Sequence, residues 1–311
     1  MQKLVEVRKR AATVRSIRSV ASTMATVASA KLSRTRERAA GMRVYAERMR
    51  EVIRRQQASA ASLGIDLVTL SPFMQPHAGT RRILLLHITG DRGMCGSYNS
   101  AIDRIAVRFV AERLAEGIEV SAIAKGLKGS KTLSRRTKAE LIDSSTWSRA
   151  GVTAEDVDGL AERLSRAFLK GEADEVWCTY TRFFSPMRRY PKLVRLLPLS
   201  FESAGSATPG EAEAAVPRWF YEPDLATVVA ELLGVFLRLQ VEDVLLESYA
   251  SEQGARMITM EEATERADRS LQELTVAYNR LRRELITSDL IGVLFASSLR
   301  EEERSMSGRE A

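Results

Sequence analysis

The residues best placed to do chemistry gather in one glycine-rich run, GDRGMCGS at residues 90–97. Nucleotide-binding folds hold phosphates in such a loop, between a strand and a helix. The spacing here is G-x-x-G-x-x-G, which fits neither the dinucleotide fingerprint nor the phosphate-binding loop, and the lysine of the latter is missing. We therefore interpret the run as a tight turn that needs glycine backbone angles and displays Asp91 and Arg92.

The remaining reactive side chains are isolated from one another. Cys95 lies near a predicted helix start, which would lower its pKa, but no base partner can be identified. His87 lies within an apolar run, where a histidine is more often a core residue with satisfied hydrogen bonds than a ligand, and His77 also stands alone. Cys178 is far from Cys95, so neither a disulfide framework nor a metal site is expected. No serine, histidine and acid set has the spacing of a hydrolase family. The sequence predicts no catalytic residue, no cofactor and no metal.

The middle of the chain must position this loop. Its sequence predicts a small α/β domain over residues 80–200. Apolar runs bounded by polar residues are typical of buried strands in a parallel sheet. Strands are expected at 82–89, 118–124, 175–181 and 194–199, and helices at 101–114 and 157–169, with a short basic helix within 125–139. The order of strand, loop, helix and strand predicts a Rossmann-like domain with a largely parallel sheet.

The last third of the chain predicts one long helix. Residues 224–299 contain no proline, and their apolar residues recur at steps of three and four: Leu225, Val229, Leu232, Phe236, Leu239, then Leu271, Leu274, Tyr278, Leu281 and Leu285. A continuous helix of that length would extend for roughly 110 Å and needs a partner along it. Gly254, between Gly234 and Gly292, is where a bend or break would fall.

The first 58 residues predict the partner helix. Its seam is alanine-rich, with Val14, Ile17, Ala21, Met24 and Ala28 at steps of three and four. Residues 1–60 carry a net charge of +11, and residues 211–273 carry −9. Opposite charges favour pairing of the two helices and select its register. Two solvated charged faces would also explain the charge, but would leave both apolar seams uncovered.

Composition narrows the class of protein. The chain has a formal charge of +7, and the basic start makes a stand-alone nucleic-acid-binding protein an alternative. Tyr45 is the only aromatic residue there for base stacking, however. No apolar run is long enough for a transmembrane helix, and no signal-peptide core precedes the first helix, so a cytosolic protein is expected. We place the boundaries at 1–60 and 221–300 for the two helices, 201–220 for a flexible linker, and 301–311 for a disordered tail.

Several motifs, in order along the chain, resemble the gamma subunit of the F-type ATP synthase. The stretches MATVASAKL and RVYAERM are similar to the first helix of that family, and GDRGMCGSYN resembles its signature loop, usually TDRGLCGGLN. YEPD at 221–224 resembles the start of its last helix. LLESYASEQGARMITMEEAT at 245–264 and YNRLRRELIT at 278–287 resemble its C-terminal pattern.

The resemblance implies a central rotor shaft without catalytic residues or cofactor. The fold would be an antiparallel coiled coil of the two terminal helices plus the α/β domain. Its implied partners are the alpha and beta subunits of the catalytic hexamer, the epsilon subunit and the membrane c-ring, with no nucleic acid and no membrane insertion. The implied location is the cytoplasmic side of the bacterial inner membrane, as a peripheral protein of a proton- or sodium-transporting complex.

The resemblance also implies partner contacts. It places Arg92 against an acidic loop of the beta subunit, Arg282 and Thr287 at a second contact, and Met24 at a family methionine. Arg283 replaces the usual glutamine, SDL follows Thr287 where QEL is usual, and Thr26 replaces a second methionine. These departures indicate a divergent version, as in an alternative synthase. Sequence alone would favour a solvated face for Arg282 and Arg283.

Overall fold

The computed structural model describes residues 2–62, 66, 68, 71–77, 79–201, 222 and 224–307. Two compact units divide the chain. One contains Met1–Thr26 and Met260–Ala311, and the other contains Val27–Thr259. The linker expected at 201–220 lies outside the described residues except for Phe201.

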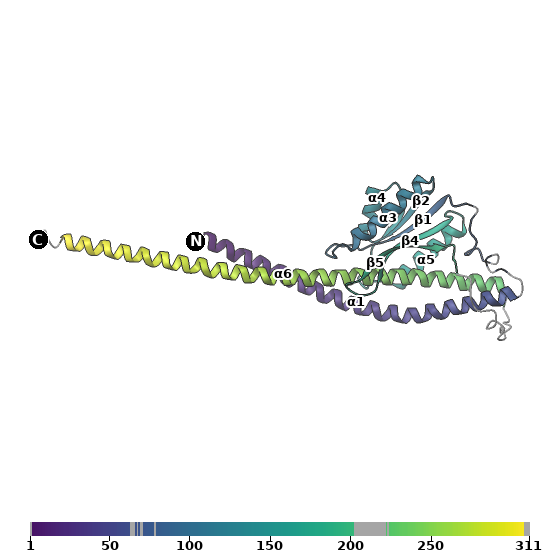
Figure 1. Ribbon diagram of the computed structural model, residues 1–311, viewed down its shortest axis with the longest axis horizontal. Coiled ribbons are helices and arrows are strands. Elements are labelled where there is room, and N and C mark those ends of the chain that lie inside the picture. The colour runs from purple at the N-terminus through teal and green to yellow at the C-terminus, as the bar shows by residue number, and fades with distance from the viewer. Residues whose placement is uncertain are drawn as a thin grey trace. The chain divides into compact units, whose positions relative to one another are not determined.

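Two long helices begin and end the described chain. Helix α1 spans Gln2–Ser62 and α6 spans Leu225–Ser307 (Figure 1). A bend or break was possible near Gly254, and the structure shows no break there, because α6 is continuous through this residue. The helix also continues to Ser307, past the predicted start of a disordered tail at 301.

In the first unit, α1 and α6 pack through small side chains. Ala21, Ala25 and Met260 form a buried cluster, with Met24 and Ala263 packed against it. An ion pair joins Arg18 on α1 to Asp268 on α6, as the opposite charges predicted. The predicted seam is wrong at Ile17, which is 55% exposed.

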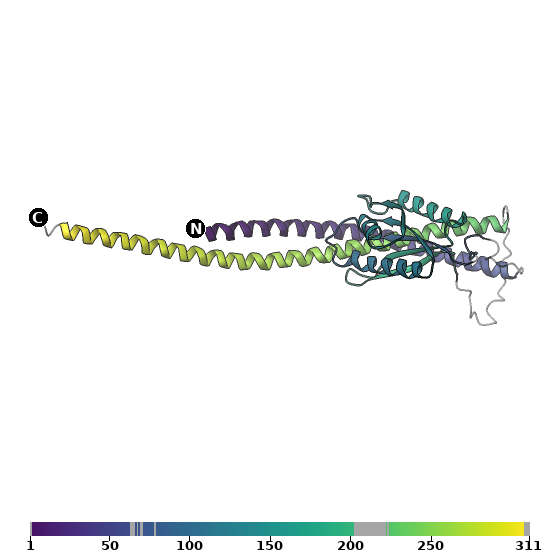
Figure 2. The ribbon, with the colours of Figure 1, turned by 90° about the horizontal axis from the view of Figure 1, so that it is seen from above.

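In the second unit, the two helices run side by side in opposite directions (Figures 1 and 2). Leu32 shares a buried cluster with Ala250, whereas the guanidinium of Arg50, further along α1, lies 6.0 Å from the ring of Phe236, earlier in α6. Arg43 on α1 donates a hydrogen bond of 2.7 Å to the carboxylate of Glu247 on α6. This ion pair is of the kind predicted between a basic and an acidic helix.

A five-stranded sheet in the order β3-β2-β1-β4-β5 lies beside these helices. The strands are β1 Arg82–Ile88, β2 Glu119–Lys125, β3 Glu140–Ser145, β4 Glu175–Phe183 and β5 Arg189–Leu197. The first four are parallel and β5 is antiparallel to β4, which confirms the largely parallel sheet. The sequence did not predict β3, whose edge position leaves it polar and half-exposed, without the apolar run of a buried strand.

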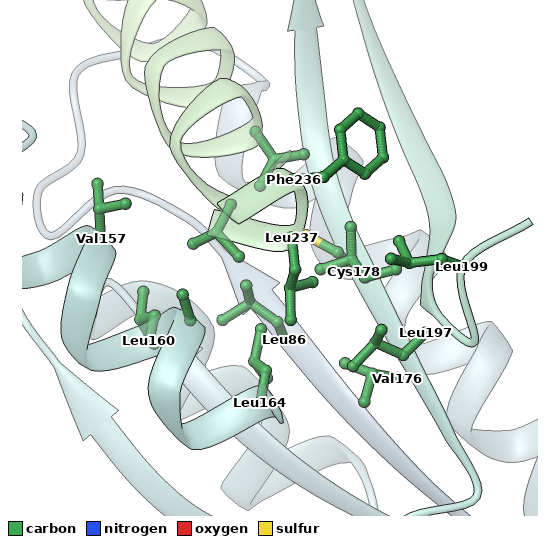
Figure 3. Packing of buried hydrophobic residues seen from close by; sticks show 14 of the residues in the cluster. Leu86, Val157, Leu160, Leu164, Val176, Cys178, Leu197, Leu199, Phe236 and Leu237 are labelled. Atoms are coloured by element: carbon green, nitrogen blue, oxygen red, sulfur yellow. The ribbon is translucent and has the colours of Figure 1, made fainter. Parts of the chain in front are cut away.

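Helices cover both faces of the sheet. Helices α3 (Tyr98–Ala115) and α4 (Leu127–Arg136) pack on one face, through a cluster that includes Ile83, Phe109 and Leu133. Helix α5 (Ala154–Leu169) and the paired α1 and α6 cover the other, where Leu86, Leu164 and Leu237 meet (Figure 3). The coiled coil and the sheet of the second unit therefore share one core.

His87 behaves as predicted for a core histidine. It is fully buried, and its Nδ1 lies 2.7 Å from Thr179 Oγ1 while its Nε2 lies 3.0 Å from Asp103 Oδ1. Both ring nitrogens are thus engaged within the α/β domain. Across the described segments, every helix is too short or too polar to cross a membrane.

Candidate functional site

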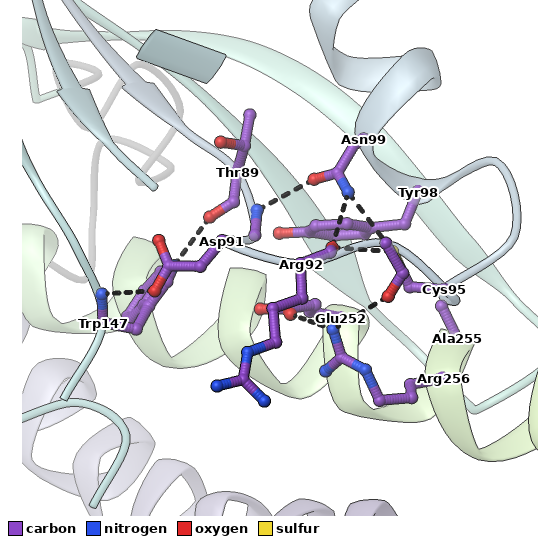
Figure 4. Close-up of polar contacts among 12 residues, drawn as sticks. Thr89, Asp91, Arg92, Cys95, Tyr98, Asn99, Trp147, Glu252, Ala255 and Arg256 are labelled. Atoms are coloured by element: carbon purple, nitrogen blue, oxygen red, sulfur yellow. Dashed lines mark hydrogen bonds and ion pairs between the residues drawn. The ribbon is translucent and has the colours of Figure 1, made fainter. Parts of the chain in front are cut away.

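The glycine-rich loop connects β1 to α3 and is fastened on one side by Asp91. The carboxylate of Asp91 accepts a hydrogen bond from the backbone N–H of Leu127 and another from that of Trp147, both at 2.9 Å (Figure 4). These two residues begin α4 and follow β3. The sequence suggested that the turn displays Asp91. The structure instead shows that Asp91 joins three elements of the domain.

The backbone N–H groups at the start of α4 are already hydrogen-bonded and are not free to bind a phosphate. The N–H groups of Leu127, Lys128 and Gly129 donate to Asp91 Oδ1, Gly90 O and Thr89 Oγ1, respectively. An internal carboxylate thus takes the place that an anion occupies at the N-terminus of a helix in a nucleotide-binding fold.

The three glycines of the loop have different roles. Gly96 has a left-handed φ of +56°, and Met94, two residues earlier, has φ 60° without being glycine. A Cβ on Gly90 would lie 2.8 Å from the carboxylate of Glu252, so a larger residue here would have to displace that buried side chain. A Cβ on Gly93 would meet nothing within 4 Å. The predicted need for glycine backbone angles is confirmed at Gly96 alone.

On its other side the loop is fastened to α6. The hydroxyl of Tyr98 lies 2.9 Å from Ser248 Oγ and donates a 3.1 Å bond to the Ser248 carbonyl. Arg256 donates to Glu252 at 2.6 Å and to the carbonyl of Gly93 at 3.5 Å. Figure 4 shows this network between the loop and the helix. Loop, helix and sheet are consequently one bonded assembly.

Burial controls the electrostatics of this contact. It raises the pKa of the Glu252 carboxyl, while the charge of Arg256 opposes that shift. Burial also raises the pKa of Cys95, helped by the negative charge of Glu252. The expectation of a lowered thiol pKa is therefore wrong, because Cys95 is packed with Tyr98 and Ala255.

Arg92 is the loop residue left for an external contact. Its side chain is exposed, and its guanidinium points away from the bonded network (Figure 4). Its carbonyl accepts a 3.3 Å bond from the Asn99 amide, which fixes the backbone. In the described part of the chain, no carboxylate forms an ion pair with Arg92.

The other predicted contact residues belong to the other unit. Met24 packs with Ala21, Ala25 and Met260, which makes it part of the helix pairing. Arg282, Arg283 and Thr287 share an exposed stretch of α6. Arg283 Nε donates to Asn279 O at 3.4 Å, and Thr287 Oγ1 donates to Arg283 O at 3.0 Å, so the hydrogen bonds seen there are within the helix.

Sequence reasoning missed Glu252 and Arg256 as the groups that hold the loop. Their spacing of four in a predicted helix was a signal, because such residues share a face. What the spacing does not reveal is that this face meets Gly90 and Gly93. Among the described residues, no group of three or more histidine, cysteine or acidic side chains could hold a metal ion.

Comparison with known proteins shows which family the chain belongs to. A family model described as ATP synthase matches residues 3–297. The ATP synthase gamma chain of Fuscovulum blasticum is 35% identical over 298 residues, covering 94% of this chain and 98% of the relative. That of Geotalea uraniireducens is 33% identical over 303 residues, covering 96% and 98%. The chain belongs to the ATP synthase gamma-chain family.

Chains in solved structures of mitochondrial ATP synthases have the same fold. A chain of the Euglena gracilis mitochondrial ATP synthase, in a structure of OSCP, F1 and c-ring, has a TM-score of 0.64 at 16% identity, covering 97% of this chain and 96% of that one. A chain of the central stalk and c-ring of the Tetrahymena thermophila enzyme has a TM-score of 0.55 at 22% identity, covering 78% and 99%.

Membership of the gamma-chain family confirms the resemblance and the fold class. It also confirms the predicted function, the rotor shaft of an F-type ATP synthase, and that this is a non-catalytic subunit of the complex. The nucleic-acid-binding alternative finds no support among these relatives.

Proposed function

We propose that this gamma chain transmits rotation between a membrane c-ring and an alpha–beta hexamer, with an epsilon subunit beside it, at the cytoplasmic side of a bacterial inner membrane. The observation that carries the proposal is the match to gamma chains over nearly the whole length, 33% identical over 96% of this chain. A rotor must pass torque from its α/β domain to its helices. The hydrogen bonds between the glycine-rich loop and α6 supply a stiff connection for this.

We place two contacts with the hexamer on exposed cations. Arg92 projects from a loop that is held on both sides, so its guanidinium can meet an acidic loop without disturbing the domain. Arg282, Arg283 and Thr287, which share an exposed stretch of α6, form the second contact. Arg282 and Arg283 point about 100° apart on a helix, so at least one can face a carboxylate or carbonyl at each resting position.

The test uses the assembled complex. We expect Arg92→Ala and Arg282→Ala each to leave assembly intact and to slow ATP hydrolysis or uncouple it from ion transport, because each removes a charge-assisted contact of about 1.5–3 kcal/mol. Arg283→Gln, which restores the usual family residue, should be tolerated and serves as the control.

Two results would contradict the proposal. If the chain does not co-purify with alpha and beta subunits, it is not the shaft of such an enzyme. If the complex forms but both alanine variants hydrolyse ATP and pump ions at wild-type rates, these arginines lie on a solvated face.

A further inference from the structure

A small pocket opens where α1, the β4–β5 hairpin and α6 meet, wholly within the unit Val27–Thr259. Its volume is about 230 Å³. Three arginines line it: Arg36 and Arg43 come from α1, and Arg182 comes from the end of β4. We call it the arginine pocket. Positive groups from elements far apart in sequence thus converge on one hollow.

One of these arginines has its partner within the chain. Arg43 donates a 2.7 Å hydrogen bond to Glu247 Oε1, and the backbone N–H of Phe183 donates one of 2.6 Å to Glu247 Oε2. Both oxygens of this buried carboxylate are therefore engaged. Glu247 holds Arg43 in place at the wall of the pocket.

The guanidinium groups of Arg36 and Arg182 are open to a ligand. Both side chains are exposed, and within the described residues neither forms an ion pair with a carboxylate. The Cζ atom of Arg182 lies 4.9 Å from the centroid of the Phe184 ring. Stacking of this kind occupies the face of a guanidinium and leaves its N–H donors directed outward in the plane. Arg182 is thus held in one orientation with its donors exposed.

The second carboxyl close to the pocket is that of Asp243. Burial raises the pKa of this carboxyl, helped by the charge of Glu247 and opposed by nearby arginines that include Arg43 and Arg182. Among the described residues at the pocket, three arginines therefore face two carboxyls. The positive charge is not balanced from within the chain.

The size and charge of the pocket restrict its ligand. Drug-sized ligands bind in pockets of roughly 300–1,000 Å³, so a whole nucleotide would not fit, whereas a small anion with a few waters does. The planar N–H fork of arginine matches the oxygens of carboxylates and phosphates. Two open guanidinium groups match the two charges of a phosphate dianion better than the single charge of a carboxylate. The apolar side chains of Phe183 and Leu246 in the wall strengthen such contacts by lowering the local dielectric.

We propose that the arginine pocket binds inorganic phosphate, with Arg36 and Arg182 as the groups that hold the anion and Arg43 as a third cation. The anion would join α1 to the β4–β5 hairpin. This site is separate from the contacts proposed for Arg92 and Arg282, and it does not depend on the shaft function.

Isothermal titration calorimetry of the purified full-length chain with sodium phosphate, at neutral pH and constant ionic strength, tests this. We expect saturable binding to one site. Sulfate should compete, because it shares the shape and charge of a phosphate dianion, and acetate should not. Phosphate should also raise the temperature of thermal unfolding, since a ligand that binds only the folded state stabilises it.

Three variants assign the binding to this pocket. Arg36→Ala/Arg182→Ala should weaken phosphate binding at least about tenfold, because both open guanidinium groups are lost. Arg182→Lys keeps the charge but not the planar fork or the stacking on Phe184, so it should leave the fold intact and weaken binding by a smaller factor. As the control, Arg34→Ala/Arg54→Ala removes two exposed arginines of α1 outside the pocket and should bind phosphate as the wild type does.

Three results would overturn the inference. Equal losses in the two double alanine variants would show a general attraction of anions to a basic chain. No response to phosphate, in a chain whose circular dichroism shows folded helix, would show that the arginines serve another purpose, such as an acidic side chain of a partner. Binding to phosphatidic acid vesicles without a response to free phosphate would assign the pocket to a lipid headgroup. The shaft function is tested separately, by co-purification with alpha and beta subunits.

Discussion

At the scale of single residues, one carboxylate organises the signature loop. Asp91 satisfies two backbone N–H groups that begin α4 and follow β3, and the indole N–H of Trp147 donates 2.6 Å to Thr89 O beside it. Asp91 thus holds the loop from inside while Arg92, its neighbour, remains exposed. Of these two adjacent residues, Asp91 is therefore bonded within the domain, and Arg92 is left exposed for the contact that we propose.

Removing the Asp91 carboxylate should loosen this loop. We expect Asp91→Ala to lower the free energy of unfolding by about 2–3 kcal/mol, because two backbone donors lose their acceptor. Asp91→Asn, which keeps one acceptor oxygen, should lose less. Urea unfolding followed by tryptophan fluorescence measures both, and equal stability of Asp91→Ala and wild type would contradict this role.

A buried ion pair supports the same end of the sheet. The Lys125 ammonium, 1% exposed, donates 2.6 Å to Asp156 Oδ1 and 2.8 Å to Thr146 O. Burial disfavours ionisation of Asp156, but hydrogen bonds from Lys125 and Thr153 outweigh it and hold the pKa of this carboxyl below its usual range. The stabilisation is therefore present above the pKa of the unfolded chain and lost as pH falls through the lower folded value.

Lys125→Met should expose that dependence. At pH 7 we expect a loss of about 3 kcal/mol in the free energy of unfolding, because Asp156 keeps its charge without its partner. The loss should shrink as pH falls through the lowered pKa of Asp156, because the carboxyl then loses the charge that Lys125 pairs. Urea unfolding from pH 3 to pH 7 checks this, and a loss that is constant with pH would rule out the ion pair as its cause.

At the scale of elements, the glycines of α6 divide into two kinds. A Cβ on Gly254 would lie 3.2 Å from the Phe183 ring and 3.4 Å from Pro186 Cα, so α6 approaches the β4–β5 hairpin closely there. A Cβ on Gly234 would meet nothing within 4 Å. Gly254 is thus retained for packing, whereas the packing observed here gives no reason for Gly234.

Alanine at these two sites should act in opposite directions. Gly234→Ala should raise the free energy of unfolding by up to about 1 kcal/mol, through helix propensity alone. Gly254→Ala should lose that gain and destabilise by about 1–2 kcal/mol, because the hairpin must shift. Thermal unfolding of both variants measures these changes in stability. A stabilised Gly254→Ala would show that the hairpin shifts without cost.

At the scale of the whole molecule, the two compact units differ in how they are stabilised. The unit from Val27 to Thr259 contains the sheet and its two cores. The other relies on a small cluster of alanine and methionine, and its apolar Leu290 and Val293 are 60% and 67% exposed. Those side chains suit a helix that is covered only after assembly.

Hydrogen exchange on the isolated chain should reveal this difference. We expect amides of residues 270–307 to exchange near the rate of a fraying helix, and amides of β1 and β4 to be protected to the level of global unfolding. Assembly with alpha and beta subunits should protect the former. Equal protection of both regions in the isolated chain would contradict a helix that is covered only after assembly with alpha and beta subunits.

The sequence by itself determined the periodic elements and the family. Helix spacing and strand runs depend on residues close in the chain, so the sequence alone predicts them. Tertiary structure decided what depends on close approach: Gly90 against Glu252, Asp91 at the start of α4, and β3 at a sheet edge without an apolar run. Such contacts join residues far apart in sequence, so no local pattern encodes which face meets which. For the same reason Cys95 was expected to be acidic from its place near a helix, and burial under α6 reversed the shift.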